Sequence, residues 1–101
     1  MPTNRLPPIH PGEILQEDFM IPLGLSANAL ARALRVPPNR VTAILQGKRS
    51  ITADTALRLA RYFGTTAQLW LNLQTSYDLK GAEAKVGPAI AAEIRPLERA
   101  A

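Results

Sequence analysis

The sequence predicts an all-α fold, a single domain of five short helices, and three observations indicate this class. Prolines and glycines divide the 101 residues into segments of helical length. Within each segment, apolar residues recur at the i, i+3, i+4 and i+7 spacing of an amphipathic helix. A Ser or Thr stands directly before three of the segments, where its side chain can accept a hydrogen bond from a helix N–H. A chain of this length suits one domain.

The first helix is predicted to begin at Pro11 and to end at Pro22 and Gly24. Proline suits a first turn because the N–H that it lacks would have no partner there, and glycine favours a helix end. Residues 1–10 precede this helix as an arm rich in proline. His10, the only histidine of the chain, is expected to cap the helix or to pack against it.

The second and third helices, residues 27–34 and 38–46, are separated by a pair of prolines. Ser26 caps the second helix, and a helix cannot run through Pro37 and Pro38. Pro38 can serve as the first residue of the third helix, whereas Pro37 cannot cap that helix with a side chain. The uncapped N–H groups at this positive helix end suit a phosphate.

The fourth and fifth helices, residues 53–63 and 67–79, each follow a threonine cap. The fifth helix is apolar nearly all round, and a helix of this kind is buried on more than one side. Because a domain this small has little core to spare, the second side predicts a homodimer. The residues expected at the dimer contact are Leu69, Trp70, Leu73 and Tyr77.

Residues 80–101 differ in composition from the domain at residues 11–79. They are rich in alanine and contain two glycines and two prolines. A weak apolar stripe favours a short helix at residues 88–95. Three interpretations fit this C-terminal tail: it packs on the domain, binds a partner or is disordered.

The net charge of +4 arises in the middle of the chain. Residues 24–63 carry seven Lys or Arg and a single acid, Asp54, whereas acids balance or outnumber bases elsewhere. A concentrated basic segment is the electrostatic footprint of a phosphate-binding surface. On charge alone, a solvated basic face without a ligand fits equally well.

Two short helices joined by a tight turn describe a helix-turn-helix, whose second helix enters the DNA major groove with its N-terminal residues. Here that helix directs Asn39 and Arg40 outward, and Asn pairs with adenine and Arg with guanine. Ala43 can only offer its methyl to a thymine or lie close to the backbone. The loop that follows adds two basic residues within reach of backbone phosphates. The candidate DNA-binding residues are Asn28, Pro38, Asn39, Arg40, Thr42, Ala43, Lys48 and Arg49.

The composition argues against an enzyme and against a membrane protein. The chain has no cysteine, and neither a glycine-rich phosphate loop nor a nucleophile motif accompanies its acids. We therefore expect no catalytic residues, no metal site and no cofactor. No apolar run reaches the length of a membrane span, and the N-terminus lacks the apolar core of a signal peptide. These features favour a cytoplasmic protein that has no membrane partner.

A family resemblance is carried by HPGEIL at residues 10–15, LSANALARAL at 25–34, VPPNRVTAILQGKRSITADTALRLARYFGT at 36–65 and LWLNLQTSYDL at 69–79. These stretches resemble the HigA-type antitoxins of the Xre/Cro helix-turn-helix family, also called virulence-associated protein I-like. The resemblance implies a five-helix lambda-repressor-like domain that dimerises partly through its last helix. It also implies binding to a palindromic operator DNA in its own promoter, and neutralisation of a HigB-like toxin, a RelE-like mRNA endonuclease.

Two positions depart from the family pattern. The turn usually carries glycine where Arg35 stands, and a positive φ there costs another residue about 1 kcal/mol. Either Arg35 adopts this φ or the turn differs from that of the family. Some members place a polar or basic residue where Ala43 lies, so base discrimination shifts onto Asn39, Arg40 and Thr42. The sequence also fits a stand-alone transcriptional repressor without a toxin, or a pure protein-interaction module. A gene for a small basic toxin directly beside this one would favour the antitoxin.

Overall fold

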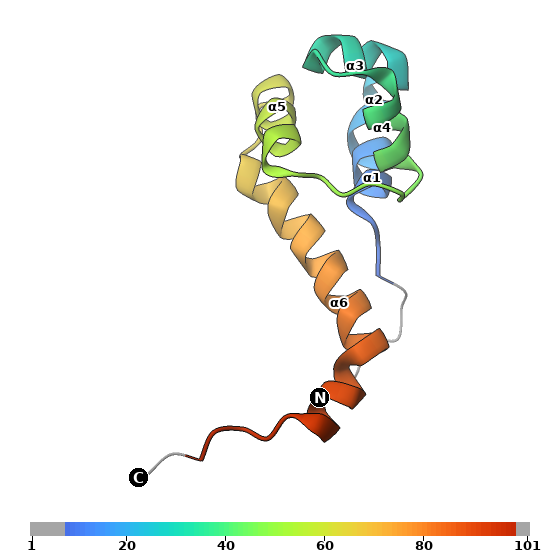
Figure 1. Cartoon of the computed structure of the whole chain (residues 1–101). Helices are drawn as coiled ribbons and strands as arrows, with labels where there is room; N and C mark the ends of the chain where they lie inside the picture. The colour runs from blue at the N-terminus through green and yellow to red at the C-terminus, as the bar shows by residue number, and fades with distance from the viewer. Residues whose placement is uncertain (1–7, 99–101) are drawn as a thin grey trace.

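The computed structural model describes residues 8–98, so the predicted arm at residues 1–10 lies mostly outside the described residues. Every regular element in the described range is helical (Figure 1). In chain order these elements are α1 (Pro11–Ile14), η1 (Leu15–Met20), α2 (Ile21–Leu23), α3 (Ala27–Leu34), α4 (Pro38–Leu45), α5 (Ala53–Phe63) and α6 (Ala67–Glu93). Because α1, η1 and α2 follow one another without a break, they form a single helical segment. The predicted all-α fold is confirmed.

The first helical segment departs from an ordinary α-helix in its middle. η1 is a π-helix, after which the N–H of Ile21 donates to the carbonyl of Gln16, five residues earlier. Pro22 lies inside the last turn and does not end it as predicted. A proline ring clashes with the carbonyl four residues earlier in an α-helix, and here the wider π turn precedes it. Gly24 ends the segment with a left-handed φ of 65°.

Side-chain caps begin three of the helices, as the sequence predicts. The hydroxyls of Ser26, Thr52 and Thr66 accept hydrogen bonds from the backbone N–H three residues later, at 3.0, 3.5 and 3.1 Å. α4 has no side-chain cap because Pro37 precedes it. Arg35 ends α3 with a φ of 60°, the only positive φ of a non-glycine residue within residues 8–98. Of the two possibilities at this position, Arg35 therefore adopts the positive φ, and the turn does not differ.

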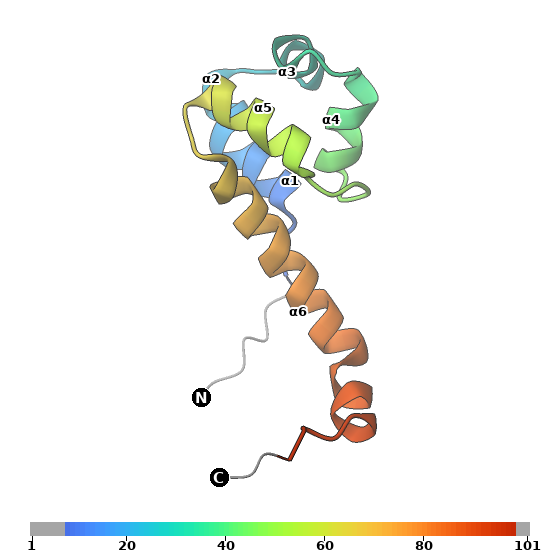
Figure 2. The ribbon, with the colours of Figure 1, turned by 60° about the vertical axis from the view of Figure 1, so that its left-hand side comes forward.

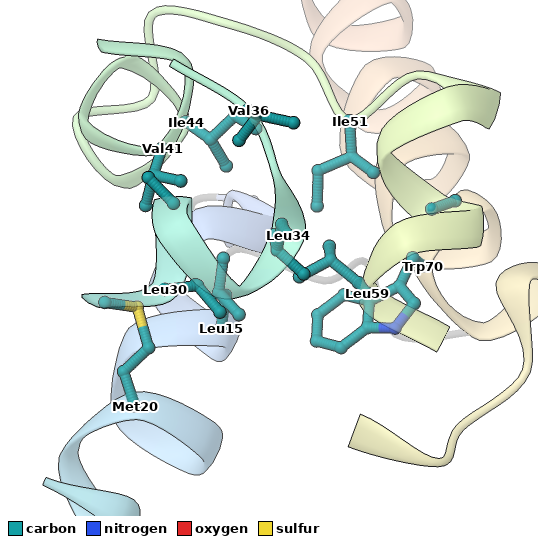
Figure 3. Close-up of a cluster of buried hydrophobic side chains, with 12 residues drawn as sticks. Leu15, Met20, Leu30, Leu34, Val36, Val41, Ile44, Ile51, Leu59 and Trp70 are labelled. Carbon is teal, nitrogen blue, oxygen red and sulfur yellow. The ribbon is translucent and has the colours of Figure 1, made fainter. Parts of the chain in front are cut away.

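The helices enclose one apolar core, to which α6 contributes the large side chain of Trp70 (Figure 3). Trp70 is fully buried, and its indole N–H donates to the hydroxyl of Thr65 at 2.8 Å. The rings of Phe19 and Phe63 lie beside it, with centroids 4.9 and 6.4 Å from the indole. The buried apolar side chains are Leu15, Met20, Leu30, Ala31, Leu34, Val36, Val41, Ile44, Ile51, Ala56, Leu59 and Trp70. This core fixes α3 and α4 relative to α5 and α6.

α6 is much longer than predicted, because it continues past residue 79 to Glu93 and spans 27 residues. The predicted helix ended at residue 79, but Gly81 and Gly87 do not break α6, because the alanines around them have the highest helix propensity of any residue. Pro88 removes one helix N–H and its ring crowds the carbonyl four residues earlier, yet the helix continues through it to Glu93. The short helix expected at residues 88–95 is thus mostly part of α6. Its second half extends away from the other helices (Figures 1 and 2), and the molecule measures 55 × 27 × 24 Å.

Two further features of residues 8–98 bear on the kind of site that the chain carries. None of the helices in this range combines the length and the hydrophobicity that a bilayer crossing requires. The same range contains no group of three or more His, Cys, Asp or Glu side chains placed to hold a metal ion. The predicted DNA-binding residues lie on α3, on α4 and in the loop that follows α4.

Candidate DNA-binding interface

α3 and α4 form the helix-turn-helix that the sequence predicts. Leu30, Ala31 and Leu34 of α3 are buried in the same core cluster as Val41 and Ile44 of α4, and the two helices pack together. Ala31 has no exposed surface, which allows the close crossing expected of a small side chain at this position. With these apolar residues turned inward, the opposite face of α4 is directed to solvent.

The exposed face of α4 and the loop after it carry most of the predicted DNA-binding residues. Exposed side chains belong to Asn28, Pro38, Asn39, Lys48 and Arg49, and half-buried side chains belong to Arg40, Thr42 and Ala43. Asn28 alone lies on α3. No side chain caps the first turn of α4, so this helix end can receive an anion such as a phosphate.

The hydroxyl of Thr42 is directed back toward its own helix. Its Oγ1 lies 3.4 Å from the carbonyl oxygen of Pro38 and 3.3 Å from that of Asn39, so it donates within α4. The Thr42 proton is thus occupied, and the oxygen lone pairs and the methyl remain for a base. Sequence periodicity places Thr42 off the reading face but does not indicate this internal bond.

Arg40 is not the free outward charge that the sequence predicts. One of its terminal nitrogens lies 3.0 Å from Oδ2 of Asp54, at the start of α5, and its side chain is only 25% exposed. The Nε of Arg40 is buried and has no hydrogen-bond partner within residues 8–98. The guanidinium of the main candidate base reader is therefore held beside α5 by a carboxylate.

Arg58 of α5 extends this ion pair into a network that reaches the turn of the motif. Its Nε donates to the same Oδ2 of Asp54 at 2.9 Å. A terminal nitrogen donates to the carbonyl oxygens of Leu34 at 2.9 Å and of Arg35 at 3.4 Å. Since these carbonyls end α3, the Arg58 guanidinium caps that helix and stabilises the strained turn.

Sequence reasoning missed Asp54 and Arg58 as members of the site. Two signals could have found them: Asp54 is the single acid of the basic segment, and Arg58 stands four residues after it on the same helix. The hydrogen bond from Arg58 lowers the pKa of the Asp54 carboxyl from its ordinary value, and the charge of Arg40 acts in the same direction. Asp54 is therefore ionised at neutral pH.

A side chain of α6 holds the end of the loop that carries Lys48 and Arg49. The buried amide of Gln74 accepts a hydrogen bond from the N–H of Ile51 at 2.8 Å and donates to Asp78 at 3.0 Å. A bond between residues so far apart in sequence holds the end of this loop on the domain. The loop position is therefore set by a side chain that the sequence analysis assigned no role.

His10 joins the start of the first helix to α6. Its Nδ1 accepts a hydrogen bond from the N–H of Gly12 at 2.9 Å, which confirms the predicted cap. Its ring lies edge-on to Tyr77, with centroids 4.8 Å apart. Burial lowers the pKa of His10 from 6.5, although the charge of Asp78 and a backbone hydrogen bond at Arg49 oppose this effect. His10 is therefore neutral at pH 7, as its acceptor role requires.

The four residues predicted at a dimer contact lie in different environments. Trp70 is fully enclosed within the single chain, so its assignment to a dimer contact is wrong. Tyr77 packs on His10, and Leu73 is half-buried against the core, whereas Leu69 is 38% exposed. The apolar character of this helix is therefore explained largely by the core of one chain.

A different apolar surface is exposed on the second half of α6. Leu79, Val86 and Ile90 are 57%, 41% and 48% exposed, and Ile94 directly after the helix is 63% exposed. Their spacing of seven, four and four residues places them along one side of the helix. This stripe is here called the α6 stripe. No described segment of the chain covers it.

The paired helices, the basic loop and the exposed face of α4 define a helix-turn-helix DNA-binding protein. The family model described as "Helix-turn-helix" matches residues 17–70, more than half of the chain. The virulence-associated protein I of Dichelobacter nodosus is 64% identical over 80 residues, which cover 79% of this chain and 74% of that protein.

Solved structures narrow the class further. An addiction module antidote protein of the HigA family from Coxiella burnetii matches with a TM-score of 0.86 and 59% identity, over 91% of this chain and 100% of that chain. The Pseudomonas aeruginosa antitoxin HigA, solved with the higBA promoter, matches with a TM-score of 0.88 and 50% identity, over 90% of this chain and 99% of that chain. The protein thus belongs to the helix-turn-helix family and, within it, to the HigA-type antitoxins.

Proposed function

We propose that this chain is the antitoxin of a type II toxin–antitoxin module and acts in the cytoplasm. In this role it binds operator DNA as a dimer, represses its own operon and neutralises a HigB/RelE-like mRNA endonuclease. The observation that carries the proposal is the reading face of α4, which is exposed and flanked by basic residues on a fold shared with a promoter-bound antitoxin.

The N-terminal half of α4 enters the major groove in this proposal. Asn39 pairs with adenine, Arg40 with guanine, and the methyl of Ala43 contacts a thymine. Thr42 accepts from a base through the lone pairs that its internal bond leaves. The uncapped helix end at Pro38, together with Asn28, Lys48 and Arg49, contacts phosphates and fixes the register without reading sequence.

The dimer is supported by the α6 stripe and by Leu69. A row of exposed apolar side chains on an extended helix is the seam that two such helices bury against each other. Two copies of α4 would then read half-sites about 34 Å apart on one face of the DNA. Leu73 and Tyr77 contribute by supporting the helix from the core side.

Expression of the neighbouring small gene, with and without this chain, tests the proposal. We expect growth arrest by the neighbour, relief of the arrest by this chain, and co-purification of the two proteins. A matched control expresses the Arg40→Ala variant, which should keep the relief while losing repression of the promoter. If the neighbour causes no arrest while DNA binding is intact, the alternative is correct: a stand-alone helix-turn-helix repressor without a toxin.

A further inference from the structure

We propose that Asp54 is a positioning residue for Arg40, and that it sets how strongly the protein prefers its operator to other DNA. The inference rests on the proposed DNA binding and adds a specificity determinant outside the reading helix. Asp54 lies on α5 and itself contacts no base in this proposal. It acts through the guanidinium that it holds.

The geometry ties Asp54 to both helices of the motif. Arg58 is anchored on the carbonyl oxygens that end α3, at 2.9 Å from that of Leu34, and holds Asp54 at 2.9 Å. Asp54 in turn holds Arg40 at 3.0 Å. The chain of contacts therefore runs from the end of α3 through α5 to the third residue of α4. A shift of either helix would change where the Arg40 guanidinium points.

A single carboxylate oxygen serves both arginines, and this leaves Arg40 only partly satisfied. The Oδ2 of Asp54 accepts from both guanidinium groups, while the Nε of Arg40 is buried without a partner within residues 8–98. The Arg40 side chain still keeps 25% of its surface exposed, so donors remain for a ligand. A guanidinium fixed at one end by a carboxylate presents its remaining N–H groups in a defined plane, which suits the bidentate pattern of guanine.

The negative charge of Asp54 also affects the preference for operator DNA over other DNA. It is the single acid among the residues 24–63, so it removes one unit of positive charge where phosphates are expected. Non-specific binding depends on the number of phosphates that Lys and Arg neutralise. With Asp54 in place, Arg40 is less free to bind an arbitrary phosphate and is aimed instead at a base edge. Both effects raise the ratio of specific to non-specific affinity.

The test compares Asp54→Asn with Asp18→Asn, an identical change at an exposed position of η1. The probes are a duplex that the wild-type chain selects from a random-sequence library and a shuffled duplex of the same composition. For Asp54→Asn we expect tighter binding to the shuffled duplex and a ratio of affinities about tenfold lower. The salt dependence on the shuffled duplex should steepen by about one counterion. Asp18→Asn should leave the ratio unchanged.

A double-mutant cycle with Arg40→Ala separates positioning from a general change of charge or fold. If Asp54 acts through Arg40, Asp54→Asn has little further effect on the ratio in the Arg40→Ala background. Asp54→Glu keeps the carboxylate and should recover most of the ratio, and it decides the question if Asp54→Asn does not fold. Circular dichroism establishes that each variant is folded at the assay temperature.

The outcomes distinguish this inference from the proposed function. A lower ratio for Asp54→Asn that disappears in the Arg40→Ala background supports the inference. An unchanged ratio in a protein that still selects and binds its duplex overturns the inference alone. If the wild-type chain selects no duplex, the proposed DNA binding is wrong, and the role inferred for Asp54 is then wrong too.

Discussion

Replacing Gly12 by alanine should strongly destabilise the protein, because the start of α1 lies directly against the end of α4. A Cβ added to Gly12 would stand 2.0 Å from the carbonyl oxygen of Ile44 and 2.8 Å from its carbon, whereas ordinary contact begins at 3.4 Å. The two helices would have to separate by more than an ångström. The Ile44 carbonyl also accepts from the N–H of Gly47 at 3.0 Å, so the shift disturbs the start of the basic loop.

The magnitude follows from the fact that both clashing groups are backbone atoms. Overpacking that side chains can absorb costs about 1–3 kcal/mol, and here no side chain can move away, so we expect a loss of about 3 kcal/mol. That is a large part of the free energy of unfolding of a typical domain, which is roughly 5–15 kcal/mol. The loss is measured by urea denaturation, with the helical signal followed by circular dichroism. We expect a lower urea concentration at the midpoint of unfolding and an unchanged dependence of the unfolding free energy on urea.

Gly81→Ala is the matched control for this change. Gly81 lies inside α6 with nothing within 4 Å of an added Cβ, so alanine should stabilise the helix by about 0.5–1 kcal/mol. The two identical substitutions are therefore predicted to have opposite signs. A loss below about 1 kcal/mol for Gly12→Ala would show that α1 and α4 are not in this close contact.

Four other changes test separate parts of the structure. Arg40→Ala should cost about 1–3 kcal/mol of operator affinity and remove discrimination at one base pair per half-site, measured by fluorescence anisotropy; unchanged affinity would contradict the role of Arg40. Val86→Glu should weaken the dimer in analytical ultracentrifugation because it places a charge in the α6 stripe, whereas Ala84→Glu on another side of α6 should not. If the two variants dimerise equally strongly, the α6 stripe is not the dimer contact. The wild type should lose stability in urea denaturation as the pH falls below 6.5, and His10→Asn should remove this loss. The reason is that the pKa of His10 in the folded protein lies below 6.5, so at such pH the unfolded chain binds more protons than the folded one. Gln74→Ala should cost about 1–3 kcal/mol in urea denaturation because the N–H of Ile51 loses its buried acceptor, and Gln68→Ala, whose exposed amide only contacts Asn72, should cost less than about 0.5 kcal/mol.

Local chemistry made much of this fold predictable from the sequence. Ser26 and Thr66 cap helices because a hydroxyl just before a helix accepts a hydrogen bond from an N–H that has no partner within the helix. The pair at Pro37 and Pro38 allows only a break between two helices. The positive φ at Arg35 was only one of two possibilities that the family pattern left open, and the left-handed end of α3 explains why Arg35 adopts it. These features depend on a few neighbouring residues, which a sequence shows directly.

Features that depend on distant residues were predicted less well. The sequence shows that Trp70 is apolar but not which neighbour covers it, and the rings of Phe19 and Phe63 turn out to do so. Arg40 looks like a free charge until α5 brings Asp54 beside it. The extent of α6 was missed for another reason. A single glycine costs only about 1 kcal/mol among strong helix formers, and even Pro88, at about 3 kcal/mol, does not end the helix before Glu93.

The direct test of DNA recognition by α4 is an NMR titration of the labelled protein with its selected duplex. If α4 is the reading helix, amide signals of residues 39–43 and 47–49 shift most, with smaller changes at Asn28. Signals of α6 beyond residue 79 stay in place if they face a second copy and not the DNA. Perturbations concentrated on α5 or on the second half of α6, with α4 unchanged, would contradict the assignment of the reading helix.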